Sequence, residues 1–130
     1  MRYMEQHFPN GYILIAEGAY MDKRSHEKNL AGMMRHMRNF DITVESVCRT
    51  LSDQQGVAVL VTADHECGGL KLAKNKSELD RSLYTNGYHT AVDVPYFIRL
   101  QIAAGVPADY FTERMDNTDI YRIMRSLLGV

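Results

Sequence analysis

The sequence predicts a single α/β domain with a mainly parallel sheet, and three observations support this fold class. Two short, unbroken apolar runs, YILIA at 12–16 and VAVLVTA at 57–63, are each typical of a strand buried on both faces. The stretch between them repeats apolar residues every three or four positions, as an amphipathic helix does. The order strand, helix, strand implies a parallel pair joined by a right-handed crossover.

Length and composition favour one globular unit over residues 1–130. The chain is long enough to bury a core of its own, and its 45% hydrophobic and 24% charged residues are ordinary for a soluble protein. A net charge of -1, with scattered Lys and Arg, gives no reason to expect nucleic acid. No apolar run approaches the roughly 20 residues that span a bilayer. We therefore expect neither nucleic acid nor a membrane as a partner.

The first half of the chain is expected to hold two helices besides the two strands. The first covers 2–8, and the second runs from 26 to 51 with a bend or break at 39–41. The segment 19–25 is expected as an irregular connection, with Ser25 as the cap of the long helix.

The second half is more polar and irregular. Residues 73–88 are expected as a loop with a short helix at 77–82. A third strand is predicted at 94–100, on an edge of the sheet because it holds Pro95. A final helix over 119–128 has cap residues directly before it and a glycine directly after it.

Sulfur-containing residues give two further expectations. Met33, Met34 and Met37 fall at helical spacing, so we expect them to fill the core. Cys48 and Cys67 could pair or stay free, because spacing alone does not decide between these states.

Carboxylates and imidazoles gather after the predicted strands and at the start of the long helix. Ligands collect at the carboxyl ends of parallel strands, which would bring these residues together. They are Glu17, Asp22, His26, Asp64, His65 and His89. Mixed nitrogen and oxygen sets suit zinc, all-oxygen sets suit magnesium, and six residues exceed the needs of one tetrahedral ion.

Each of these residues alone has an ordinary alternative explanation, such as an exposed loop carboxylate, a helix-start carboxylate or a turn former. The metal-site interpretation rests on their joint occurrence at positions that the sheet would bring together. His7 and His36 are not accompanied by other potential metal ligands at such positions, so for these two residues we prefer the ordinary interpretation without a metal.

Three motifs carry a family resemblance. AEGAYMDKRSHEKN, VTADHECGGL and YHTAVDVP resemble, in order and spacing, the C-terminal part of the alkaline phosphatases, and the similarity covers nearly the whole chain. The resemblance implies part of a three-layer sandwich with a mainly parallel sheet. It also implies a metal-dependent phosphomonoesterase that uses two zinc ions and one magnesium ion.

The resemblance assigns a role to each matching position. Asp22, His26 and His89 would hold the first zinc, Asp64 and His65 two positions of the second, and Glu17 one position of the magnesium. Lys23 would reach the substrate phosphate through water. Cys67 stands where many relatives have threonine, and the resemblance gives it no role.

The family's nucleophile, its phosphate-binding arginine and an aspartate that bridges two metals belong to its N-terminal half. None of the serines of this chain matches the nucleophile's sequence context. We therefore expect a C-terminal fragment that hydrolyses phosphate monoesters poorly or not at all alone. We also expect a homodimer or association with the N-terminal half of the family's domain.

Two alternatives stay open. The first is a phosphodiesterase or phosphate mutase of the same superfamily. The second is a non-catalytic metal-binding or partner subunit. Many relatives are exported, whereas the first residues of this chain lack the apolar stretch of a signal peptide, so the sequence predicts no location.

Overall fold

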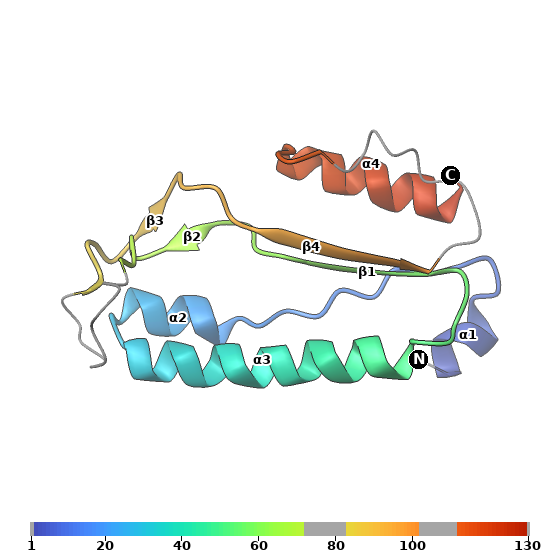
Figure 1. Cartoon of the computed structure of the whole chain (residues 1–130), viewed down its shortest axis with the longest axis horizontal. Coiled ribbons are helices and arrows are strands. Elements are labelled where there is room, and N and C mark those ends of the chain that lie inside the picture. The colour runs from blue at the N-terminus through green and yellow to red at the C-terminus, as the bar shows by residue number, and fades with distance from the viewer. Residues whose placement is uncertain (1, 72–82, 102–111, 130) are drawn as a thin grey trace. The chain divides into compact units, whose positions relative to one another are not determined.

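The computed structural model describes residues 2–71, 83–101 and 112–129 of a mixed α/β chain (Figure 1). The elements, in chain order, are α1 (Arg2–His7), α2 (Tyr20–His26), α3 (Leu30–Thr50), β1 (Val57–Thr62), β2 (Glu66–Cys67), β3 (His89–Thr90), β4 (Tyr96–Gln101) and α4 (Asn117–Leu128). The chain divides into two compact units. The first comprises 1–16, 55–58 and 100–130, and the second comprises 17–54 and 59–99. Among the described helices, none has the length and apolar character needed to cross a membrane.

The long helix predicted from residue 26 begins later, and a separate short helix precedes it. His26 ends α2, and Lys28 takes a positive φ of 54°, which interrupts the helical path. Asn29 then caps α3, its side chain accepting a hydrogen bond from the Gly32 N–H at 2.9 Å. The expected connection over 19–25 is therefore mostly helix, and the expected bend at 39–41 is absent from α3.

Ser25 is not the cap that the sequence predicts, because it lies inside α2. Its buried hydroxyl donates a hydrogen bond to the Met21 carbonyl at 2.9 Å, so the side chain is bonded within α2 and does not cap α3. The cap of α3 is four residues further along the chain, at Asn29.

The core of the second unit forms where α2 and α3 pack together. Leu30 and Met33 are buried with Leu83 and Tyr84, and Met21 packs against them. The prediction for the other two methionines is wrong. Met34 and Met37 are 42% and 47% exposed, because the face of α3 that meets the core is narrower than the apolar stripe.

A mainly parallel sheet is not present among the described residues. β1 is hydrogen-bonded to β4, and Figure 1 shows the chain running in opposite directions along them. β2 pairs antiparallel with β3. The predicted strand at 57–63 is confirmed as β1, but its side chains are half-buried rather than covered on both faces.

The apolar run at 12–16 does not form the strand that the sequence predicts. Leu14 and Ile15 are 62% and 82% exposed, and the run has no strand partner among the described residues. An apolar run becomes a buried strand only where neighbouring strands accept its hydrogen bonds, and among the described residues the run has no such neighbouring strand.

The expected association with a second copy or with the rest of a family domain stays a prediction.

The remaining helices and the third strand agree with the sequence. α1 and α4 lie where predicted, and β4 begins directly after Pro95. Asp116 and Asp119 form a capping box at the start of α4, and Gly129 ends the helix with a φ of 70°. The short helix expected at 77–82 lies outside the described residues.

The cap at Asn29 gives a stability prediction. Replacing it by alanine (Asn29→Ala) leaves the Gly32 N–H without its acceptor, so the free energy of unfolding should fall by about 1 kcal/mol. Urea unfolding followed by circular dichroism measures this change. Asn39→Ala, the same substitution at an exposed position inside α3, is the matched control and should not destabilise. Equal losses in both variants would contradict the capping role.

Candidate metal centre

Two residues of α2 provide the first half of a cluster of metal-binding side chains. Asp22 and His26 are four positions apart, so both project from one face of the helix. Their facing atoms, Oδ1 of Asp22 and Nε2 of His26, lie 3.3 Å apart. The D-x-x-x-H spacing in the sequence correctly predicts this proximity.

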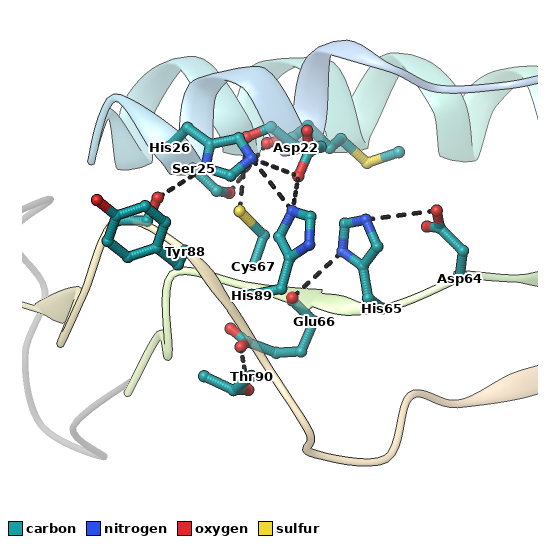
Figure 2. Close-up of polar contacts among 12 residues, drawn as sticks. Asp22, Ser25, His26, Asp64, His65, Glu66, Cys67, Tyr88, His89 and Thr90 are labelled. Atoms are coloured by element: carbon teal, nitrogen blue, oxygen red, sulfur yellow. Dashed lines mark hydrogen bonds and ion pairs between the residues drawn. The ribbon is translucent and has the colours of Figure 1, made fainter.

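Two strand residues provide the second half. Cys67 and His89 are direct partners in the β2–β3 pairing, so their side chains project from the same face of the strand pair. α2 contacts β2, and Figure 2 shows Cys67 and His89 pointing toward Asp22 and His26. The four side chains offer ligand atoms that all lie within 4.8 Å of one another.

Three of these atoms have the spacing of a tetrahedral metal site. Nε2 of His89 lies 3.4 Å from Oδ1 of Asp22 and 3.2 Å from Nε2 of His26. A tetrahedral zinc with bonds of about 2.0 to 2.1 Å separates its ligand atoms by roughly 3.3 Å. The three atoms therefore already stand at the distances that a zinc ion requires.

The hydrogen bonds around these atoms also suit a cation. Nδ1 of His26 lies 2.7 Å from the Gly87 carbonyl, which only accepts, so Nδ1 carries a proton and Nε2 is the ring nitrogen that faces the cluster. Oδ1 of Asp22 is buried and makes no hydrogen bond, and the two imidazole nitrogens that face it at 3.3 and 3.4 Å form ion pairs with it only when protonated. A buried carboxylate oxygen without a donor is costly, and a cation between it and the imidazoles would satisfy it.

Asp64 and His65, predicted as a second metal pair, adjoin this cluster. The His65 ring stacks on the His89 ring, with centroids 3.5 Å apart and planes at 19°. Nε2 of His65 lies 3.3 Å from Oδ2 of Asp64, whose side chain is 86% exposed. The second predicted pair is therefore next to the first cluster, with its imidazole partly covered and its carboxylate open to solvent.

Glu17 and Lys23 are not joined to the cluster by any hydrogen bond or ion pair among the described residues. Glu17 is exposed just before α2. The Lys23 ammonium lies over the Tyr20 ring, 5.0 Å from its centroid. The two roles implied for these residues thus stay predictions.

Cys67 is the member of the cluster that the sequence did not assign. Its Sγ lies 3.8 Å from the Asp22 backbone carbonyl, and neither it nor Cys48 forms a disulfide. Burial, together with the contact and charge of Asp22 and the charge of Glu66, raises the pKa of the Cys67 thiol to about 12. Without a metal the side chain is therefore a neutral thiol near neutral pH. Cys67 joins the cluster because it is paired with His89 across the two strands. The sequence does not reveal this pairing, because the two residues are far apart along the chain.

Glu66 projects from the other face of the strand pair and fixes its shape. Its carboxylate accepts hydrogen bonds from the N–H groups of Gly69 and Leu70, both at 3.2 Å, and from the hydroxyl of its cross-strand partner Thr90. Burial alone would raise the pKa of Glu66, but these hydrogen bonds and the nearby His89 hold it below its ordinary value. Glu66 therefore supports the strands that carry the cluster.

Gly68, directly after Cys67, is required where β2 turns away. Its φ is 87°, and a Cβ there would lie 2.4 Å from the Tyr84 ring. Its N–H donates to the Tyr88 carbonyl at 2.7 Å, which keeps the two strands together next to the cluster.

Comparison with known proteins identifies the family. The family model described as alkaline phosphatase matches residues 2–79, more than half of the chain. The chain belongs to the alkaline phosphatase family. This agrees with the resemblance that the three sequence motifs carry.

Curated alkaline phosphatases are similar to the chain at low identity. Alkaline phosphatase 4 of Bacillus subtilis (strain 168) is 23% identical over 110 residues, which make up 85% of this chain and 23% of that protein. The repressible alkaline phosphatase of Saccharomyces cerevisiae is 36% identical over 62 residues, 47% of this chain and 11% of the yeast protein. Alkaline phosphatase 3 of Bacillus subtilis (strain 168) is 27% identical over 63 residues, 48% of this chain and 14% of that protein.

The chain spans less than a quarter of the length of each of these curated relatives. No solved structure matches it significantly. Similarity therefore establishes the family, and the metal centre has to be judged from its own geometry.

The Glu66 hydrogen bonds predict a pH-dependent stability. The pKa of this carboxyl in the folded protein lies below its ordinary 4.5, so its contribution is complete above about pH 4.5 and is lost as the pH falls through the folded-state pKa. In metal-free buffer, the stability advantage of the parent chain over Glu66→Gln should be larger at about pH 7 than at about pH 3. Urea unfolding at both pH values measures it.

Thr90→Val provides the matched test, since it removes the hydroxyl that donates to Glu66. The losses from Glu66→Gln and Thr90→Val should be less than additive in the double variant, because both break one interaction. A stability difference that stays constant with pH would contradict this role of Glu66.

Proposed function

We propose that this chain carries the zinc-binding part of a metal-dependent phosphomonoester hydrolase. One observation carries the proposal: the Asp22 oxygen and the His26 and His89 nitrogens are mutually 3.2 to 3.4 Å apart. Membership of the alkaline phosphatase family supports zinc as the ion and a phosphate monoester as the substrate. In this proposal the three residues hold the first zinc.

The other predicted residues extend the proposal to a second zinc and a magnesium ion. Asp64 and His65 would contribute to the second zinc, and the stacking of His65 on His89 supports two neighbouring ions. Glu17 would bind magnesium, and Lys23 would reach phosphate through water. These two assignments rest on the family resemblance alone.

When bound, zinc would lower the pKa of an attacking hydroxyl and stabilise the leaving oxygen. The residues of this chain hold the site in shape. The Gly87 carbonyl fixes the tautomer and the orientation of His26, and the His65 ring limits the rotation of His89. The Glu66–Thr90 hydrogen bond keeps β2 and β3 in register behind them.

The nucleophile and the phosphate-binding arginine are proposed to come from the N-terminal half of the family's domain. Ser25, next to the cluster on α2, is no substitute, because its buried hydroxyl donates to the Met21 carbonyl. The same proposal includes the family's three-layer sandwich with a mainly parallel sheet. In that sheet the exposed run at 12–16 would gain strand neighbours.

Zinc binding tests the proposed ligands. His26→Ala should lower zinc affinity by a factor of at least about 100, because losing a direct ligand costs more than losing a hydrogen-bond partner behind one. Competition with a chromophoric chelator measures the affinity. His7→Ala is the matched control, since His7 lies in α1 and bonds the Tyr3 carbonyl. Equal affinities for His26→Ala and the parent chain would rule out the proposed site.

Hydrolysis of a chromogenic phosphate monoester tests whether the nucleophile and the phosphate-binding arginine come from outside this chain. With zinc and magnesium added, the purified chain should release no more product than the His26→Ala variant under the same conditions. The physical reason is that a bound metal without an aligned nucleophile and phosphate clamp supplies little transition-state stabilisation. Substantial turnover that disappears in His26→Ala would show that the chain holds its own nucleophile.

A further inference from the structure

We propose that Cys67 is the fourth protein ligand of the metal ion held by Asp22, His26 and His89. This inference rests on the proposed zinc site and adds a ligand that neither the motifs nor the family comparison assigns. The resulting set would be two imidazole nitrogens, one carboxylate oxygen and one thiolate sulfur. Sets of this kind, with sulfur among the ligands, suit zinc and other soft divalent ions rather than magnesium.

Strand pairing carries the first step of the inference. Cys67 is the direct partner of His89, and partners in an antiparallel pair have Cβ atoms about 4.5 to 5.5 Å apart on the same face. In the observed register, the strand face that presents His89 to the helix therefore presents Cys67 as well. Figure 2 shows the sulfur directed toward Asp22 and His26, whereas Glu66 and Thr90 point away.

Distances carry the second step. Sγ of Cys67 lies within 4.8 Å of each of the other three ligand atoms. Tetrahedral zinc, with a zinc–sulfur bond of about 2.3 Å, places sulfur roughly 3.5 Å from nitrogen and oxygen ligands. A shift of roughly an ångström closes this difference, and rotation about the Cα–Cβ bond of Cys67 supplies such a shift without moving the strand.

Charge carries the third step. Coordination replaces the S–H bond of Cys67 by a metal–sulfur bond and releases one proton to solvent. The thiolate and the Asp22 carboxylate together carry two negative charges, which balance a divalent cation beside two neutral imidazoles. Oδ1 of Asp22, which is buried and makes no hydrogen bond, would be compensated by the charge of the cation in the same event.

The consequence concerns the open position of the metal. A zinc ion with four protein ligands is closed, whereas a catalytic zinc keeps one position for water or substrate. In this chain Cys67 would fill that position. The first site would then be a closed, sulfur-containing centre as long as the thiolate stays bound.

Cobalt binding provides the decisive experiment, because Co²⁺ takes zinc sites and a bound thiolate adds a near-ultraviolet sulfur-to-cobalt charge-transfer band. The parent chain and Cys48→Ser should both show this band, and Cys67→Ser should lose it. Cys48 and Cys67 are the two cysteines of the chain, so a band in Cys48→Ser comes from Cys67 alone. This comparison holds even if Cys67→Ser folds poorly.

Proton release gives a second measurement. Calorimetry in two buffers of different ionisation enthalpy should show the parent chain releasing about one more proton on zinc binding than Cys67→Ser. The zinc affinity of Cys67→Ser should fall by a factor of about 10 or more, while that of Cys48→Ser stays unchanged.

The outcomes separate the two proposals. Bound cobalt without a charge-transfer band in the parent chain would overturn the role of Cys67 and leave the three-residue site intact. A band that persists in Cys67→Ser would also overturn it. Failure of the parent chain to retain either cobalt or zinc would overturn the metal site itself.

Discussion

The register of β2 against β3 is the constraint on which the candidate metal centre depends. Cys67 lies opposite His89, and Glu66 lies opposite Thr90. A slip by one residue would turn Cys67 away from α2 and bring Glu66 toward it. The Glu66–Thr90 hydrogen bond and the Gly68–Tyr88 backbone hydrogen bond fix the register. Because the two strands contain only two residues each, these local bonds replace the long ladder that would normally prevent slippage.

The other half of the centre depends on tertiary packing rather than on helix propensity. α2 has seven residues, too few for a stable helix by itself. It is held by packing on α3, where Met21 meets the core around Leu30 and Met33. The break at Lys28 matters for this reason, because it lets α2 pack against α3 instead of continuing its axis. The helix break therefore contributes to the placement of Asp22 and His26.

Local sequence patterns correctly predicted features that depend on residues close together in the chain. They failed for features that depend on contacts with residues far away in the sequence. The Asp22–His26 spacing and the α4 caps follow from contacts within about one helical turn, and both were predictable. Cys67 could not be assigned, because its relation to His89 depends on a strand pairing between two residues 22 positions apart in the sequence. The run at 12–16 was misinterpreted for the same reason, since the apolar pattern of a strand says nothing about whether its neighbours are present.

The two candidate carboxylates, Asp22 and Asp64, differ in their access to water, and this difference has a chemical meaning. The side chains of Asp22 and His26 are each 39% exposed and converge with His89, whereas the Asp64 side chain is 86% exposed. A cation between Asp22 and the imidazoles would meet ligand atoms already in place, so little side-chain entropy remains to be lost on binding. A cation at Asp64 would first have to order a solvated carboxylate. The first position should therefore fill before the second, and its ligands set the position of His89 against which His65 stacks.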